Sequence, residues 1–95
     1  MAETVRWGIL GTGKISRAFA NALKDVPGAV LAAVGSRSHD KAAAFAEEFG
    51  ALASYGSCEL LAQAEGIDLI YIGTPHPEHA GNALMALRAG KGVLC

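Results

Sequence analysis

Short apolar runs alternate with amphipathic helical patterns along the 95 residues of this chain, and glycine or proline marks most changes from one to the other. Each apolar run has the length and character of a buried β-strand. The runs predict five strands, at 5–10, 30–35, within 51–55, at 68–73 and at 92–95. Strands that alternate with helices are parallel, because parallel neighbours need a crossover connection.

Four helices are predicted between these strands from apolar residues spaced three and four positions apart. Ser38 and Ser57 stand where N-caps are expected, and Gly50, Gly66 and Gly90 where helices end. Right-handed crossovers put helices on both faces of such a sheet, so we predict a doubly wound, three-layer α/β/α fold in one domain, 1–95. The residues predicted to face the sheet are Ile15, Ala18, Phe19, Ala22 and Leu23; Ala42, Phe45, Ala46 and Phe49; Leu60, Leu61 and Ala64; and Ala80, Ala83, Leu84 and Leu87.

The first strand and the first helix are joined by a glycine-rich turn, Gly11-Thr12-Gly13-Lys14-Ile15-Ser16. A nucleotide-binding fold places its phosphate-binding loop at this position, where glycines permit a sharp turn and a close approach to the helix N–H groups. Ser16 replaces the third glycine of the usual G-x-G-x-x-G pattern and adds only a small volume. We predict that residues 11–15 bind a cofactor diphosphate. The alternative is a turn that only joins strand to helix.

The second strand ends in a basic, hydroxyl-bearing sequence. In chains that select NAD, an acid about 20 residues after the glycine turn binds the ribose 2′-hydroxyl. None lies between positions 26 and 39; instead Ser36, Arg37 and Ser38 are followed by Lys41, which suits a 2′-phosphate. We predict NADP in preference to NAD, bound through Ser36, Arg37 and Lys41. The alternative is that Arg37 is a solvated loop arginine.

The fourth strand leads into Thr74-Pro75-His76, across the point of strand reversal from the glycine turn. We predict that Thr74, Pro75 and His76 contact the cofactor. For His79 two interpretations stay open, a cofactor contact or a first-turn histidine bonded to backbone. His76 and His79 have a His-x-x-His spacing without a third ligand nearby, so we predict no metal site. No residue is predicted to be catalytic, since neither a Ser-His-Asp set nor paired carboxylates can be assigned.

Charge and composition argue against several classes of partner. Eight basic residues balance nine acidic ones, so no strong field favours nucleic acid or an anionic membrane. The longest stretch without a charged residue runs from 26 to 36, short of the about 20 residues that cross a bilayer. Cys58 and Cys95 form neither a disulfide framework nor a metal motif, which fits a reducing compartment. We predict a soluble cytoplasmic protein without nucleic-acid or membrane partners.

Four motifs follow one another along the whole chain: RWGILGTGKIS at 6–16; SR at 36–37 with KAAAFA at 41–46; YIGTPHPEH at 71–79; and AGKGVLC at 89–95. In this order and at these spacings they resemble the glucose-fructose oxidoreductase and inositol dehydrogenase (Gfo/Idh/MocA) family. The Trp-Gly-Ile opening, Gly-Lys-Ile-Ser and Gly-Lys-x-Val-Leu-Cys are most similar to its dihydrodiol dehydrogenase-like branch, which uses NADP.

The resemblance implies a Rossmann fold and an oxidoreductase that moves a hydride between the nicotinamide and a sugar, polyol or diol. It also implies that the stretch from Gly11 to Ile15 binds the diphosphate, Ser36 and Arg37 the adenosine ribose or its phosphate, and residues 74–79 lie along the cofactor. The family continues after its Val-Leu-Cys strand with a Glu-Lys-Pro motif and a second domain with a catalytic histidine. Neither is present in this sequence. We therefore expect a sheet incomplete at its C-terminal end, an absent substrate domain, and cofactor binding without turnover.

Two other hypotheses stay open at this point. One is a free-standing nucleotide-sensing or interaction module that uses the same glycine turn without catalysis. The other is a folded remnant that binds nothing. Whichever hypothesis holds, the short apolar last strand lacks the neighbour that the complete domain would give it, and such an edge favours association. We therefore expect a dimer or aggregation through this strand edge, which allows a homo-oligomer.

Overall fold

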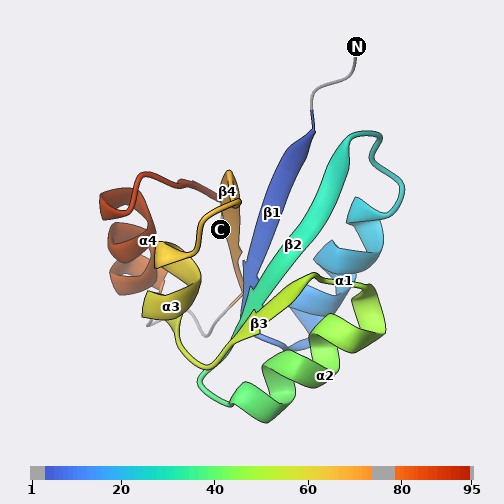
Figure 1. Ribbon diagram of the computed structural model, residues 1–95, viewed down its shortest axis with the longest axis horizontal. Coiled ribbons are helices and arrows are strands. Elements are labelled where there is room, and N and C mark those ends of the chain that lie inside the picture. The colour runs from blue at the N-terminus through green and yellow to red at the C-terminus, as the bar shows by residue number, and fades with distance from the viewer. Residues whose placement is uncertain (1–3, 74–78, 95) are drawn as a thin grey trace.

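The computed structural model describes residues 4–73 and 79–94 of the chain. Within these ranges five parallel strands form one sheet in the order β3-β2-β1-β4-β5 (Figure 1). The predicted doubly wound α/β fold is therefore confirmed. The elements are β1 (Val5–Leu10), α1 (Lys14–Leu23), β2 (Ala29–Gly35), α2 (His39–Phe49), β3 (Ala53–Tyr55), α3 (Cys58–Gln63), β4 (Leu69–Ile72), α4 (His79–Arg88) and β5 (Gly92–Leu94).

The order of the strands reverses between β1 and β4. From β1 the chain adds β2 and then β3 on one side, and it returns to add β4 and β5 on the other. Ligands of open α/β sheets bind beyond the carboxyl ends of the strands at such a reversal. The ends of β1 and β4 therefore mark the place where a binding crevice is expected.

Helices cover both faces of the sheet, with α1 and α2 on one side and α3 and α4 on the other (Figure 1). Neighbouring residues of a strand point to opposite faces, so Ile9 and Leu10 enter different cores. On the α1 and α2 side the buried residues are Ile9, Ala20, Val34, Ala42, Phe45 and Ala46. On the α3 and α4 side they are Leu10, Ala32, Ala33, Leu61, Ala62, Ile67, Ile70, Ile72 and Ala86.

The predicted helix caps of α2 and α3 are confirmed. The Ser38 hydroxyl accepts a hydrogen bond from the Lys41 N–H at 3.3 Å, and the Ser57 hydroxyl accepts one from the Leu60 N–H at 3.1 Å. Gly50 ends α2 in the left-handed conformation, with φ of 78°. The third helix ends earlier than predicted, at Gln63.

The buried face of α1 differs from the predicted one. Leu23 is buried as expected, but Ile15 is 64% exposed and Ala18 and Ala22 are also exposed. Ser16 and Ala20 are buried instead. Phe19, partly buried as predicted, stacks on Tyr71 of β4 with ring centroids 4.0 Å apart. Two small residues, Ser16 and Ala20, thus face the sheet, where they allow a close approach to the strand ends.

The inward faces of α3 and α4 were also predicted only in part. Leu61 is buried and Ala83 packs against the core, but Leu60, Leu84 and Leu87 are each more than half exposed. Ala62 in α3 and Ala86 in α4 take the buried positions. One alanine of each helix thus faces the core together with Leu61, and the leucines at 60, 84 and 87 lie outside. By contrast, the predicted α2 face is confirmed, with Ala42, Phe45 and Ala46 buried and Phe49 half-buried.

Candidate functional site

Main-chain hydrogen bonds tie together the carboxyl ends of three strands at the point of reversal. The Gly11 N–H donates to the Gly35 carbonyl at the end of β2, and the Gly73 N–H donates to the Leu10 carbonyl at the end of β1, both at 2.8 Å. Gly11 has φ of 102°, a conformation that side chains other than glycine's rarely adopt. The predicted sharp turn thus begins at Gly11, and it is held against the neighbouring strands.

The helix α1 begins directly after the glycine turn. Gly13 is the N-cap, and no side chain caps the helix there. The Arg17 N–H donates to the Gly13 carbonyl at 3.0 Å, which begins the helical bonding. The N–H groups of the first turn, at residues 14–16, have no intrahelical acceptor in an α-helix. They lie at the positive end of the helix dipole, an arrangement that binds anions.

The space beside Gly13 is open. A Cβ placed on Gly13 would find no atom within 4 Å, and its φ of −80° is accessible to any residue. Gly35 is different, because a Cβ there would lie 2.9 Å from the Cβ of Leu61. Packing thus accounts for the glycine at 35 but not for the one at 13. Next to the N–H groups of α1, Gly13 leaves bare backbone that a phosphate group can approach, so the site fits a dinucleotide.

The segment after β2 places its hydroxyls by local hydrogen bonds. The Ser36 N–H donates to the Tyr55 carbonyl at 3.1 Å, and the Ser36 hydroxyl accepts a bond from the Ser38 N–H at 3.2 Å. The hydroxyls of Ser36 and Ser38 each accept a main-chain N–H and keep their own hydrogen to donate. Arg37, within this turn, and Lys41, in the first turn of α2, are exposed. Since Gly11 bonds to Gly35, this group adjoins the glycine turn.

Part of the predicted site lies outside the described residues. Thr74, Pro75 and His76 fall between the two described ranges, so their predicted contacts stay predictions. His79 is the first residue of α4, and only its place in the helix is described. The structure thus brings together the predicted diphosphate and ribose groups, at the ends of β1 and β2.

Sequence reasoning overlooked one pair near this site, Ser16 and Gly73. Ser16 is fully buried, and a Cβ on Gly73 would overlap its hydroxyl oxygen. The sequence signal for this pair is Ser16 itself, because a serine replaces the third glycine of the pattern and adds a polar group as well as a small volume.

An ion pair between Arg6 and Asp68 lies at the opposite end of the strands from the glycine turn. Near the start of β1, the Arg6 Nε and Nη2 donate to the Asp68 carboxylate at 3.2 and 3.0 Å, and the Arg6 N–H donates to it at 2.8 Å. The hydrogen bonds from Arg6 lower the pKa of Asp68, and the same pair raises the pKa of Arg6. Since both groups lie at the amino ends of the strands, these shifts concern stability and not the crevice.

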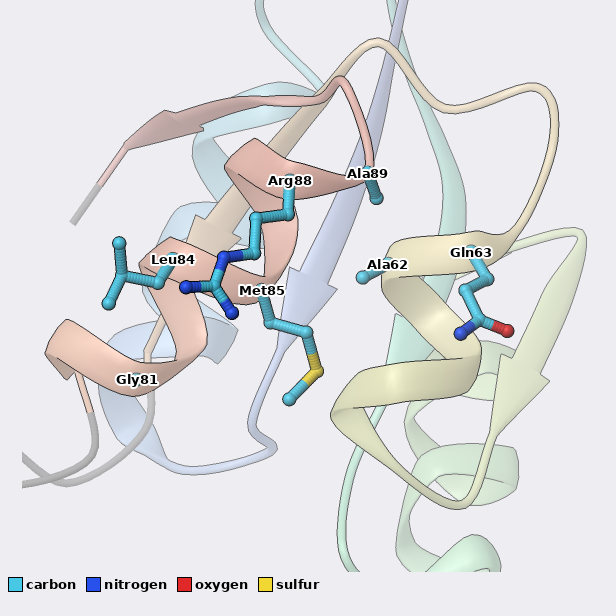
Figure 2. A pocket seen from close by; sticks show the side chains of 7 residues that line it. All are labelled: Ala62, Gln63, Gly81, Leu84, Met85, Arg88 and Ala89. Atoms are coloured by element: carbon cyan, nitrogen blue, oxygen red, sulfur yellow. The ribbon is translucent and has the colours of Figure 1, made fainter.

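A separate pocket of about 450 Å³ lies between α3 and α4 (Figure 2). Met85 of α4 points toward α3 across it, and Gln63 lies on the α3 side (Figure 2). The pocket contains none of the predicted site residues. Its lining residues are Ala62, Gln63, Gly81, Leu84, Met85, Arg88 and Ala89.

Residues 4–73 and 79–94 hold no cluster of three or more histidine, cysteine or acidic residues that would hold a metal ion. In the same ranges, no helix has the length and apolar character needed to cross a membrane.

Known dehydrogenases are similar to this chain in sequence. The chain is 44% identical over 92 residues to trans-1,2-dihydrobenzene-1,2-diol dehydrogenase of Xenopus laevis, and 39% identical over 93 residues to that of Mus musculus. These matches cover 95% and 96% of the chain but only 28% of each relative. The chain therefore spans less than a third of the length of these curated relatives.

Solved structures of inositol dehydrogenases superpose on the chain. Myo-inositol dehydrogenase from Lactobacillus casei, in complex with NAD(H) and myo-inositol, gives a TM-score of 0.87 at 29% identity, over 95% of this chain and 27% of that one. Scyllo-inositol dehydrogenase from the same organism, with NAD(H) and scyllo-inositol, gives 0.87 at 26% identity, over 96% and 27%.

A family model covers almost the whole chain. Residues 5–95 match the GFO_IDH_MocA family, an oxidoreductase family with an NAD-binding Rossmann fold. This match agrees with the glycine turn at the point of strand reversal and with the similarity to the diol and inositol dehydrogenases. The chain therefore belongs to the Gfo/Idh/MocA family of oxidoreductases, and it has that family's NAD-binding Rossmann fold.

Proposed function

We propose that this chain binds NADP(H) for an oxidoreductase that transfers a hydride to or from a hydroxyl-bearing carbon of a sugar, polyol or diol. The observation that carries the proposal is the open backbone at Gly13, next to helix N–H groups that no side chain caps. Main-chain donors of this kind bind a diphosphate without a charged side chain. When bound, the nicotinamide supplies the hydride donor or acceptor.

NADP is proposed over NAD because of the groups after β2. Arg37 and Lys41 supply positive charge there, and Ser36 and Ser38 each have a hydroxyl hydrogen to donate to a 2′-phosphate. An NAD site places a carboxylate in this position to accept bonds from the ribose 2′-hydroxyl. The Lactobacillus casei relatives are solved with NAD(H), so family membership alone does not decide between the two cofactors.

The substrate class is proposed from the relatives, which are dehydrogenases of diols and inositols. We propose further that Thr74, Pro75, His76 and His79 adjoin the nicotinamide half of the cofactor. For the 95 residues alone we propose cofactor binding without turnover.

Calorimetric titration of the folded chain with NADPH and with NADH tests this function. We expect both to bind, NADPH more tightly, and no oxidation of NADPH when ketoses or inosose substrates are added. Absence of heat with either nucleotide would reject cofactor binding. Equal affinity would reject the choice of NADP, and turnover would reject the proposal that the chain alone is inactive.

A further inference from the structure

Ser16 is a buried polar residue that the proposed function leaves unexplained. It is fully buried, and its hydroxyl has no hydrogen-bond partner within residues 4–73 and 79–94. A buried hydroxyl without a partner destabilises a folded chain relative to an apolar group of similar size. Alanine would nearly fill the same space without this cost, so stability alone does not account for serine here.

Gly73 lies directly against this hydroxyl. A Cβ on Gly73 would overlap the Ser16 Oγ and would lie 3.4 Å from both the Ser16 Cβ and the Tyr71 Cε2. The φ of Gly73 is not positive, so its backbone conformation does not require glycine. Ser16 is therefore the reason that position 73 has no side chain.

The contact between these two residues bridges the point of strand reversal. Ser16 belongs to the first turn of α1, which follows β1, and Gly73 directly follows β4. The Gly73 N–H also donates to the Leu10 carbonyl at 2.8 Å, which fixes the strand ends against each other. The first turn of α1 and the end of β4 lie on the two sides of the expected crevice, and Ser16 and Gly73 are where they meet.

We propose that Ser16 and Gly73 are a matched pair of positioning residues, whose contact sets the separation between the diphosphate-binding turn and the carboxyl end of β4. The inference rests on the proposed function, because the separation matters to a ligand that spans both sides. A carbon atom at position 73 needs about 3.5 Å from its neighbours, so either the Ser16 hydroxyl rotates away within a fully buried site or the two sides move apart. In the second case the main-chain donors of α1 would be misplaced for the cofactor.

Four variants of the chain test the pair by NADPH affinity and thermal midpoint. Gly73→Ala should weaken NADPH binding tenfold or more. Adding Ser16→Gly to it removes the overlapping hydroxyl and should restore the affinity to within threefold of the unaltered chain. Ser16→Ala alone removes the contact without adding an atom at position 73, so it should weaken NADPH binding by more than threefold; it should not lower the midpoint, because it also removes a buried hydroxyl without a partner. An affinity within threefold of the unaltered chain would overturn the role of the Ser16 hydroxyl.

Gly8→Ala is the matched control for a merely structural effect. A Cβ on Gly8 would lie 3.3 Å from Ile67 and Leu61 side-chain atoms, in the core on the far side of the sheet from α1. It should lower the midpoint and leave the NADPH affinity of the folded chain unchanged. A comparable loss of affinity in Gly8→Ala and Gly73→Ala would overturn the positioning role.

The remaining outcomes separate this inference from the proposed function. If the unaltered chain does not bind NADPH, both are rejected. If the unaltered chain binds NADPH and Gly73→Ala binds it equally well, only the positioning pair is rejected. The same holds if Gly73→Ala folds and adding Ser16→Gly does not restore its NADPH affinity. If Gly73→Ala does not fold, a folded double variant with restored affinity supports the pair, and an unfolded one overturns it.

Discussion

Replacing Gly13 by valine should remove dinucleotide binding while leaving the fold in place. The φ of −80° and ψ of −171° at Gly13 are extended values that β-branched residues favour, and a Cβ there meets no atom within 4 Å. Valine is a poorer N-cap than glycine by about 1 kcal/mol. In a chain of 95 residues this corresponds to a fall of about 4–8 °C in the thermal midpoint.

The expected loss of affinity in Gly13→Val follows from the main-chain donors that the valine side chain would screen. A hydrogen bond from a main-chain N–H to a charged phosphate oxygen contributes about 1.5–3 kcal/mol. Loss of two such bonds at the start of α1 amounts to at least about 3 kcal/mol, or about 100-fold in Kd. NADPH and NADH should lose affinity by the same factor, because both carry the diphosphate.

Calorimetry with both nucleotides, together with thermal melts, measures this effect. Gly81→Ala is the control, because a Cβ on Gly81 also meets no atom within 4 Å, and Gly81 lies in α4, away from the glycine turn. It should retain full affinity. The reasoning is refuted if a folded Gly13→Val binds NADPH within about threefold of the unaltered chain, a loss below about 0.7 kcal/mol.

Three further predictions concern selectivity, pH and packing. Arg37→Ala should weaken NADPH binding about tenfold and NADH binding little, because a charged hydrogen bond of about 1.5 kcal/mol is lost only with the 2′-phosphate; equal losses would contradict the assignment. Asp68→Asn should lower the thermal midpoint near neutral pH, because Arg6 lowers the pKa of the carboxyl in the folded chain. That stabilisation is present above the unfolded pKa of about 3.9 and is lost as the pH falls through the lower folded pKa, so the two melting curves should converge as the solution is acidified below the unfolded pKa. In denaturant unfolding Leu23→Ala should cost about 2–5 kcal/mol and the exposed Ile15→Ala about 0.5 or less.

Local patterns in the sequence predicted the architecture because each element has its own signal. The glycine turn follows an apolar strand, and Ser38 and Ser57 begin helices where their hydroxyls accept N–H bonds. Right-handed crossovers then place helices on both faces of the sheet. The diphosphate and ribose groups could be predicted for the same reason, since they occupy fixed places relative to the ends of β1 and β2.

The orientation of α1 could not be predicted from apolar spacing. The spacing favoured Ile15 as an inward residue, but the approach of α1 to β4 is limited by the space beside Gly73, and Ser16 occupies that space. This contact joins residues that lie far apart in the chain, at positions 16 and 73, so no local sequence pattern predicts it. Similarly, Ala86 and not Leu87 is buried in α4, because the distance of the helix from the sheet decides which residue fits.

The main-chain bonds of Gly11 and Gly73 have a consequence for amide hydrogen exchange. Both N–H groups donate to carbonyls of neighbouring strands, so they exchange only when the sheet opens, whether or not a ligand is bound. The first-turn amides of α1, at residues 14–16, have no intrahelical acceptor and should exchange far faster. Addition of NADPH should slow exchange at residues 14–16 and leave Gly11 and Gly73 unchanged. The glycine turn would then be rigid before the cofactor binds. The association rate would be set by diffusion of the cofactor to the site and not by folding of the turn.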